Sequence, residues 1–576
     1  MKPMTTNTNS KSTKLRRLGA VVFALPLFLG ACGAQAQLGV DGPTALEPHE
    51  LPQIEPVTKG GHLTILDSAK DPGFDPAKSQ SLAITSAGLV HRRLTTWEIL
   101  PGKDPQVVPD LATDTGKVSE DGKTWTYHLK KGLKFSDGSP ITAKEIKYGV
   151  ERSFAPTLSG GLGYHKSLLA GTDKYEGPYS GQHLDSIETP DDYTIIFHLV
   201  RPYGDWPWIV SLPAFSPVPP AKDNPEGYSR APIASGPYEI KNYRTGVEVQ
   251  MVRNKYWDQD DVRLAGPDSI TFKLGNDPVV SAQKLISAQN QYADTFSSSK
   301  VPAAQLITAA QSPAVGQRLQ IADAGPLLYL AINTQRITDL HVRRAFNYAM
   351  DKSAVVKAAG GALAGKISST LITPGISGFE QYDLYPAPPT GDLEAAKAEL
   401  DKAKDKPTGP LVLLTKNKSE DVLRCEAIAR SLEKLGFKVR IEPVESSVYS
   451  ERTTQGDGNS YDLALASWNP DFPSAGANLQ PLFASSEVGN GGVNRSRFKD
   501  PQIDQIIEKA SATFNQAEAA KLWHEADKAI MEKAPVVPLN YQRFSYLRGR
   551  NVTNFFVPGF PSYPNYLIIG LKNDSK

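Results

Sequence analysis

The sequence predicts a mixed α/β protein of two or three lobes, and three observations carry this prediction. A chain of 576 residues is several times longer than one ordinary domain, and its 40% hydrophobic residues can fill more than one core. Short apolar runs typical of strands alternate with segments whose apolar residues recur at helical spacing. Such alternation favours a largely parallel sheet, whose ligands lie beyond the carboxyl ends of its strands.

The first 350 residues contain both kinds of element. From 125 to 135 apolar and polar residues alternate as in strands, and residues 136–138, Ser-Asp-Gly, are typical of a turn. Thr142 and Glu145 have the spacing of a capping box, so we expect a helix to begin there. A second helix is predicted over 339–350, where apolar residues form a stripe with the i, i+3, i+4, i+7 pattern.

The clearest α/β pattern is a strand-helix-strand unit. Apolar runs at 411–414 and 437–441 flank the segment 425–435, in which apolar residues recur at helical spacing, and Gly436 ends that helix. A third strand is predicted over 461–467, where apolar and polar residues alternate. These elements predict an α/β lobe in this part of the chain.

Two more helices are predicted near the C-terminus. Asp500 followed by Pro501 is a typical helix start, because an aspartate can cap the chain and proline fits the first turn. Asn515 and Glu518 have the spacing of a second capping box. No internal repeat is visible along the chain.

Composition excludes several classes of protein. The 63 Lys and Arg residues almost balance the 62 Asp and Glu residues, so the net charge of +1 does not favour a nucleic-acid binder. The mean hydropathy is negative and no apolar run is long, which excludes a polytopic membrane protein. Two cysteines in this length exclude a disulfide scaffold and a cysteine-based metal cluster.

The N-terminus is typical of an exported lipoprotein. Basic residues at 11–17 precede an apolar run from Gly19 to Leu29, which is the pattern of a secretory signal. The string Leu-Gly-Ala-Cys that ends at Cys32 resembles a bacterial lipobox, so we expect a signal peptide over 1–31 and a lipid anchor on Cys32. Residues 32–59 are rich in Pro and Gly and are expected to be a flexible tether. The alternative is an ordinary cleaved signal in which Cys32 is incidental.

Catalytic and metal motifs are absent from the sequence. No histidines are spaced i, i+4, and the His524-Glu525 pair lacks the second histidine of a zinc-protease motif because Lys528 stands in its place. No serine has the Gly-x-Ser-x-Gly context of a nucleophile elbow. Gly360 to Lys366 resembles a phosphate loop, but Ile367 follows where Ser or Thr would bind magnesium. We therefore predict no cofactor and no metal, and expect Cys425 to be a core residue on its helical stripe.

Five groups of residues together resemble the extracytoplasmic solute-binding proteins of ABC importers, in particular the peptide- and nickel-binding family. The matching strings, in the family's order, are Val108–Ile146, Ala234–Ile240, Arg253–Trp257, Leu330–Thr334 with Val342–Lys352, and Trp468–Phe472. The lipobox agrees with this resemblance independently, because some members of the family are tethered lipoproteins.

The resemblance implies a type 2 periplasmic-binding-protein fold, in which the chain crosses twice between two α/β lobes and an extra domain is inserted in the first. On that basis we assign 60–103, 231–326 and 544–576 to the first lobe, 104–230 to the inserted domain, and 327–543 to the second lobe. A connection of two crossings permits the lobes to close around a ligand.

The resemblance assigns its most specific role to Asp471. It follows the strand predicted to end near residue 467, and Trp468, Asp471 and Phe472 match the family's Trp-x-x-Asp-aromatic motif. In peptide-binding members this carboxylate receives the α-ammonium group of the ligand. In a site poor in water a fixed carboxylate would make a charge-assisted pair with that amine. The alternative is that Asp471 caps its own loop, and Trp468 could line the pocket or belong to the core.

The resemblance also places Ser235 and Gly236 near the bound ligand, where a missing side chain lets backbone approach, although Gly236 could simply belong to a turn. The ligand carboxylate would need a cation, and Lys366, Arg424 and Arg495 are candidates that the sequence cannot separate. Three aromatic residues interrupted by proline are expected in a loop that packs on the surface of the inserted domain or lines the cleft: Tyr203, Trp206 and Trp208.

The resemblance therefore implies a monomeric, lipid-anchored receptor on the extracytoplasmic face of the cell membrane. It would capture oligopeptides in the cleft between its lobes and pass them to an ABC permease driven by ATPase subunits, without covalent chemistry of its own. One alternative is the same fold with a non-peptide solute, such as a metal chelate, an opine-like conjugate or an oligosaccharide. A more remote alternative is an exported hydrolase whose catalytic residues are scattered along the chain.

Overall fold

The computed structural model describes residues 53–78, 84–158, 160–257, 262–322, 324–489 and 491–572. The fold described here is that of the compact unit that begins at residue 42, within these ranges. The predicted signal peptide over 1–31 and the predicted anchor Cys32 lie outside the described residues. The described part of the predicted tether, residues 53–59, contains no helix or strand.

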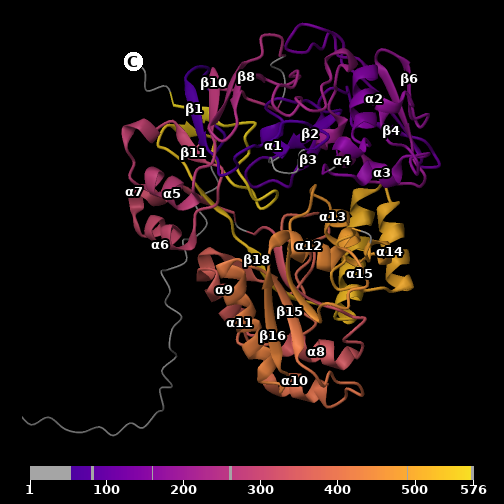
Figure 1. Ribbon diagram of the computed structural model, residues 1–576, viewed down its shortest axis with the longest axis vertical. Helices are drawn as coiled ribbons and strands as arrows, with labels where there is room; N and C mark the ends of the chain where they lie inside the picture. The colour runs from indigo at the N-terminus through magenta and orange to yellow at the C-terminus, as the bar shows by residue number, and fades with distance from the viewer. Residues whose placement is uncertain are drawn as a thin grey trace, which may run out of the picture. The chain divides into compact units, whose positions relative to one another are not determined.

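The first lobe is built on a five-stranded sheet whose strands come from distant parts of the chain (Figure 1). In spatial order the strands are β11 (Thr295–Ser297), β1 (His62–Leu66), β10 (Ser269–Lys273), β9 (Glu248–Arg253) and β8 (Tyr238–Arg244). β1 runs parallel to β10 and β11, whereas β9 runs antiparallel to both of its neighbours. Ile65, Phe272 and Phe296 are fully buried in the core of this lobe.

The second lobe is built on a six-stranded sheet. In spatial order its strands are β14 (Gly365–Ile367), β18 (Val536–Gln542), β13 (Leu327–Ile332), β17 (Leu463–Trp468), β15 (Leu411–Lys416) and β16 (Val439–Val444). α11 (Ser419–Glu433) connects β15 to β16, which are parallel neighbours, so the predicted strand-helix-strand unit is confirmed. Cys425 on α11 is completely buried, as predicted, and burial raises the pKa of its thiol to about 12.

The prediction of a largely parallel sheet is wrong for the second lobe. Two pairings among its described strands are parallel, those of β15 with β16 and with β17. The other three, of β13 with β17, of β13 with β18 and of β14 with β18, are antiparallel. Parallel pairing requires a crossover connection, and in this lobe helices α11 and α12 supply crossovers only between β15, β16 and β17. β13 enters the sheet from the first lobe and β18 leaves the sheet toward that lobe, so no crossover within the second lobe sets their direction.

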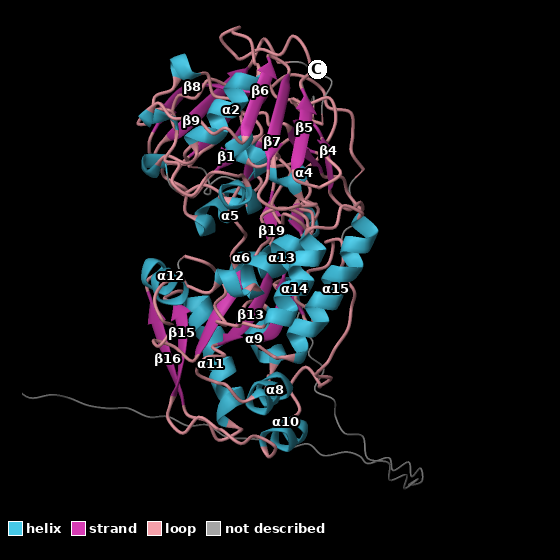
Figure 2. Ribbon diagram, turned by 90° about the vertical axis from the view of Figure 1, so that its right-hand side faces the viewer, coloured by secondary structure: helices cyan, strands magenta, loops and turns pink. Residues whose placement is uncertain are grey.

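Helices cover the second sheet (Figure 2). They are α8 (Leu340–Ala349), α9 (Lys352–Ala358), α10 (Leu393–Leu400), α12 (Ser446–Thr454), α13 (Ala475–Phe483), α14 (Pro501–Ser511) and α15 (Gln516–Glu532). The predicted starts of α8 and α14 are confirmed, because the carboxylates of Asp339 and Asp500 accept hydrogen bonds from backbone amides of the first turns. At α15 the structure shows the Asn515 half of the predicted capping box, in which the side chain accepts from the Glu518 amide.

The inserted region carries a separate antiparallel sheet. Its strands, in spatial order, are β4 (Lys117–Val118), β5 (Thr124–His128), β7 (Thr194–His198) and β6 (Ile187–Asp191). Its helices are α2 (Ala143–Arg152), α3 (Tyr164–Leu168) and α4 (Trp206–Ile209). Both bonds of the capping box between Thr142 and Glu145 are present, as predicted. β5 ends at His128, earlier than predicted, and Gly138 closes the expected turn with a φ of 88°.

The two segments that cross between the lobes lie side by side. β12 (Leu319–Ile321), just before β13, pairs antiparallel with β19 (Ser545–Leu547), just after β18. The remaining strands are β2 (Thr95–Glu98), β3 (Gln106–Pro109), β20 (Val552–Thr553) and β21 (Gly570–Leu571), and the remaining helices are α1 (Ile84–Ala87), α5 (Pro278–Ile286), α6 (Ala303–Gln311) and α7 (Pro313–Gly316).

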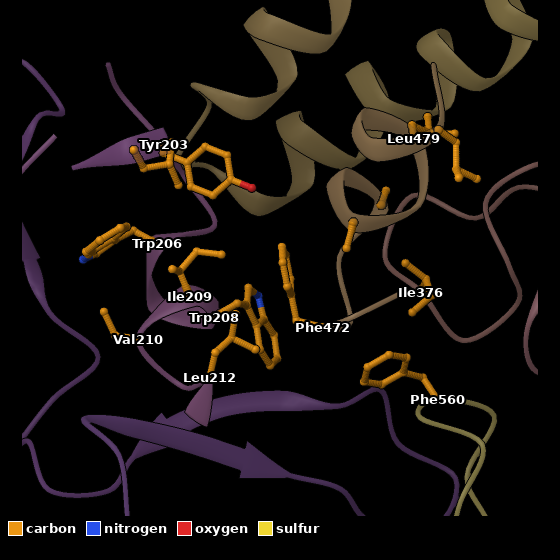
Figure 3. Close-up of a cluster of buried hydrophobic side chains, with 14 of the residues drawn as sticks. Tyr203, Trp206, Trp208, Ile209, Val210, Leu212, Ile376, Phe472, Leu479 and Phe560 are labelled. Carbon is orange, nitrogen blue, oxygen red and sulfur yellow. The ribbon is translucent and has the colours of Figure 1, made fainter. Parts of the chain in front are cut away.

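The largest hydrophobic cluster joins the inserted region to the second lobe. Figure 3 shows side chains of both regions in this cluster, among them Trp206 and Trp208 from α4 and Phe472 from the loop after β17. Tyr203, Trp206 and Trp208 are exposed by 2%, 0% and 8%, so our expectation of surface packing is wrong. Tyr203 lies in the loop before α4, as predicted, but Trp206 and Trp208 lie in α4 itself. The proline at 207 is tolerated there because it occupies the first turn of the helix, where no amide donor is needed.

Candidate ligand-binding site

Asp471 lies where the second lobe meets the inserted region. It sits in the loop between β17 and α13, beyond the carboxyl end of its strand. Its Oδ2 atom accepts a hydrogen bond of 2.7 Å from the hydroxyl of Tyr164 on α3. Burial raises the pKa of Asp471, and the hydrogen bond from Tyr164 opposes this shift only in part. Asp471 as a whole is half-buried.

The two aromatic residues of the same motif are held by packing. Phe472 is completely buried, and its ring meets the ring of Tyr164 edge to face at a centroid distance of 5.2 Å. Trp468 is half-buried, and its indole N–H donates to the Ala477 carbonyl at 2.7 Å. Both residues therefore fix the loop that presents Asp471. Their direct contact with a ligand stays a prediction.

Glu487 is a second carboxylate whose charge acts on Tyr164. It lies in a single helical turn, Ser485–Glu487, and burial raises its pKa. Burial raises the pKa of Tyr164 well above its usual value, and the charges of Asp471, Tyr203 and Glu487 raise it further. Among the described residues, neither carboxylate forms an ion pair. Sequence reasoning missed Glu487 and Tyr164, because neither lies in a recognisable motif.

The three candidate cations for a ligand carboxylate have different surroundings. Arg424 on α11 already pairs with Glu420 at 2.5 Å and with Asp421 at 3.2 Å. Lys366 is exposed on β14, the edge strand of the second sheet. Arg495 has its Nε and Nη1 atoms buried, and within the described part of the chain they find no hydrogen-bond acceptor.

Ser235 and Gly236 make hydrogen bonds within the first lobe. Both amides donate to the Val90 carbonyl, at 3.0 and 2.8 Å, and the Ser235 hydroxyl accepts from the Arg92 amide at 2.8 Å. A Cβ atom on Gly236 would lie 2.8 Å from the Leu89 carbonyl oxygen, which explains why glycine is required there. A contact of these two residues with the ligand stays a prediction.

A second contact joins the inserted region to the second lobe at Asp205. Ser474 donates a hydrogen bond of 2.5 Å to Asp205 Oδ2, beside a cavity of about 420 Å³. The cavity is lined by residues of the inserted region and by residues near α13 and α15, including Trp208, Phe514 and Trp523. Burial raises the pKa of Asp205 to about 6, and the hydroxyl of Ser474 opposes this shift.

The Asp205→Asn variant is expected to be more stable than the wild type at pH 7.5 and about equally stable at pH 4. The raised pKa means that the folded protein holds this proton more tightly than the unfolded chain, so stability is lost as the pH rises through about 6. Asparagine does not titrate, and the difference at pH 7.5 is at most about 3 kcal/mol. Thermal melting of both proteins at the two pH values measures it. A stability difference between the two proteins that grows toward acid pH would contradict this prediction.

No group of three or more His, Cys, Asp or Glu side chains within the described ranges could hold a metal ion. His524, which begins the incomplete zinc motif, lies 3.1 Å from Glu380 and packs edge to face on Tyr382. Helices in the described part of the chain are too short or too polar to cross a membrane.

Comparison with known proteins decides the family. The model of the bacterial extracellular solute-binding proteins, family 5 (middle), matches residues 106–490, which is more than half of the chain. The chain belongs to this family. The resemblance found in the sequence strings is therefore confirmed.

Relatives of the family 5 protein cover nearly its whole length. A solved structure of clavulanic acid biosynthesis oligopeptide binding protein 2 is 30% identical, covers 90% of this chain and 96% of its own, and superposes with a TM-score of 0.83. The probable D,D-dipeptide-binding periplasmic protein of Escherichia coli K12 is 25% identical over 86% of this chain and 91% of its own. The dipeptide-binding protein DppE of Bacillus subtilis 168 is 23% identical over 94% of this chain and 96% of its own. The two-lobe periplasmic-binding-protein fold is thus confirmed.

Proposed function

We propose that this family 5 protein is the substrate-binding component of an ABC importer and captures oligopeptides outside the cell. The observation that carries the proposal is the half-buried Asp471, whose carboxylate accepts a hydrogen bond from a hydroxyl but has no cation among the described residues. An α-ammonium group would supply the missing positive charge through a charge-assisted hydrogen bond. The relatives are named as binding proteins for oligopeptides or dipeptides, and this supports the ligand class.

In this proposal Asp471 orients the peptide and backbone hydrogen bonds supply much of the affinity, which makes side-chain selectivity loose. Glu487, whose charge also raises the pKa of Tyr164, adds negative potential at the ammonium end. The protein binds and releases its ligand unchanged and hands it to a membrane permease driven by ATPase subunits. The two adjacent crossings near β12 and β19 provide a hinge for closing and opening.

We infer the following division of the chain for this cycle. The first lobe comprises 60–103, 231–326 and 544–576, the inserted domain comprises 104–230, and the second lobe comprises 327–543. The composition of the sheets supports these boundaries, because the first sheet draws strands only from the first of these groups and the second sheet only from the last. The ligand is enclosed between the lobes, with Ser235 and Gly236 on the first-lobe side.

We also infer that the mature protein is a monomer anchored by a lipid on Cys32 to the outer face of the cell membrane. The lipobox supports this anchor, and the family's extracellular location agrees with it. A tether of about 28 residues, counted from Cys32 to residue 59, would leave the lobes free to reach a permease. Anchoring would keep the receptor close to that permease.

Native mass spectrometry of the protein purified without denaturant is expected to show a ladder of bound peptide masses. Loose side-chain selectivity predicts several co-purified peptides instead of one ligand. After removal of these ligands, trialanine added back should bind without being cleaved, which calorimetry and peptide analysis measure together. A single non-peptide mass would contradict peptide capture, and cleavage of trialanine would favour the exported hydrolase.

A further inference from the structure

The cavity beside Asp205 has no part in the proposed peptide site. It has a volume of about 420 Å³, which is enough for a small organic molecule, and its walls come from the inserted region and from the second lobe near α13 and α15. Asp471, Tyr164 and Glu487 are not among the described residues that line it. The cavity is therefore a candidate site for a second ligand, whose chemistry can be inferred from the walls.

Aromatic residues line the cavity from both sides. Trp125 on β5 and Trp208 on α4 belong to the inserted region. Trp523 on α15 and Phe514, in the loop before α15, belong to the second lobe. Trp125 and Phe514 meet across the boundary, with a distance of 6.0 Å between their ring centroids. The faces of aromatic rings carry negative partial charge, so walls of this kind favour a cation over an anion.

The charged residues of the walls are acidic. Asp104 and Asp205 line the cavity, whereas no Lys, Arg or His is among the described residues that do so. The Oδ2 atom of Asp205 accepts the hydrogen bond from Ser474, and its Oδ1 atom accepts none within the described ranges. No described cation forms an ion pair with Asp205. A half-buried carboxylate without a cation is costly, so the walls lack a positive charge.

Packing fixes the carboxylate of Asp205 beside an indole ring. A Cβ atom on Gly476, in the first turn of α13, would lie 2.9 Å from Asp205 Oδ2 and 3.0 Å from Trp523 Cζ2, so these two atoms flank the same point. The hydroxyl of Ser474, which donates to Asp205, is itself held because it accepts from the Gly476 amide at 3.1 Å. The carboxylate is thus in place before a ligand arrives, which lowers the cost of binding.

We propose that this cavity is a second ligand site, which binds a small alkylated ammonium ion from solution. Aromatic rings and a carboxylate suit such an ion, because its alkyl groups pack on the rings and its charge needs no hydrogen-bond acceptor. The proposal also gives a reason for an aspartate at position 205, where asparagine is expected to make the empty protein more stable at neutral pH. The site lies outside the peptide site and does not depend on the proposed function.

The test compares choline with its neutral isostere 3,3-dimethylbutan-1-ol by calorimetry of ligand-free protein at pH 7.5. Choline is expected to bind at least about 10-fold more tightly, because the isostere lacks the charge. Asp205→Asn should remove this preference by weakening choline, while the melting temperature of the empty protein rises. Asp104→Asn is the matched control: Asp104 is exposed, so its screened charge should change the affinity for choline by less than about 5-fold.

A second variant tests the aromatic walls. Phe514 is 41% exposed, so Phe514→Leu should fold normally and keep an apolar side chain while it removes the ring. The affinity for choline is expected to fall about 2- to 5-fold and that for the neutral isostere to stay unchanged. Equal changes for both compounds would contradict a cation at the ring. This variant also keeps the proposal testable should Asp205→Asn fail to fold.

The outcomes separate this inference from peptide capture. If choline does not bind to the wild type, or binds no better than its isostere, the ammonium site is wrong, and trialanine binding is untouched by that result. Choline should still bind when trialanine is saturating, and its displacement would make the cavity part of the peptide site. Equal losses in Asp205→Asn and Asp104→Asn would mean that the half-buried carboxylate has no special role. Sedimentation of the protein with phosphatidylcholine vesicles, blocked by choline, would replace the free ion with a lipid headgroup.

Discussion

The Asp471→Asn variant is expected to lose most of its affinity for peptides. Asparagine keeps the size of the side chain and can still accept from Tyr164, but it removes the charge that would pair with an α-ammonium group. Removing one partner of a desolvated charge pair costs about 2–5 kcal/mol, which corresponds to a dissociation constant about 30-fold to several thousand-fold higher. Calorimetric titration of ligand-free protein with trialanine measures the loss.

The same variant should not harm the empty protein. The carboxylate of Asp471 has no cation among the described residues, and burial disfavours its charge, so a neutral amide is expected to leave the melting temperature unchanged or slightly higher. Tyr164→Phe is the matched control, since it removes the hydroxyl from the same contact but keeps the carboxylate. A large drop in the melting temperature of Asp471→Asn would show that the carboxylate serves the fold and not the ligand.

The pH dependence of peptide binding follows from the raised pKa of Asp471. Burial makes this carboxyl group take up a proton at a higher pH than an ordinary aspartate, and the protonated form cannot pair with an ammonium group. Affinity is therefore expected to fall as the pH drops through this raised pKa, before ordinary carboxyl groups titrate. The weak binding of Asp471→Asn should change much less over the same range, so dissociation constants measured from pH 8 to pH 4 distinguish the two proteins.

Local sequence patterns predicted the elements that depend on local interactions. Asp339 and Asp500 cap their helices because a side chain and an amide two residues away are enough to form the bond. β15, α11 and β16 were predictable because one short stretch holds both strands and their crossover. The direction of β13 relative to its neighbouring strands was not predictable, since its partners β17 and β18 lie more than 100 residues further along the chain. Pairing over such distances depends on how the lobes are connected, which periodicity does not reveal.

The candidate site likewise contains one part that the sequence could predict and another that it could not. The motif around Asp471 is continuous in the sequence, so its position beyond a strand could be predicted. Its partner Tyr164 is 307 residues away, and nothing in the sequence of its short helix distinguishes it from the other tyrosines. Arg495 became distinct from Arg424 only through its surroundings, since the carboxylates that pair with Arg424 lie three and four residues away on one helix turn. Unpaired charge is a property of tertiary structure and has no local sequence pattern.

The Arg152→Met variant is expected to lower the free energy of unfolding more than any surface substitution. Arg152 ends α2, and its two terminal nitrogens donate to both oxygens of Asp75 at 2.6 and 2.8 Å, while Nε donates to Asp223 at 2.8 Å. The guanidinium also lies 4.7 Å from the ring centroid of Tyr228. The side chains of Arg152 and Asp75 are completely buried. Removal of one member of a buried ion pair leaves a buried charge uncompensated and costs about 3–5 kcal/mol.

Arg230→Met is the matched control, because it removes an arginine from an ion pair of similar length at the surface. Arg230 lies 2.9 Å from Asp71, with side chains exposed by 55% and 41%, and exposed pairs of this kind contribute about 0–1 kcal/mol. Thermal and urea unfolding should therefore separate the two variants clearly. Equal losses would mean that burial of the Asp75–Arg152–Asp223 group is unimportant. Since Arg152 joins α2 to the segment before α1 and its carboxylate partners are Asp75 and Asp223, not Asp471, its loss should weaken the fold without changing peptide affinity in the molecules that remain folded.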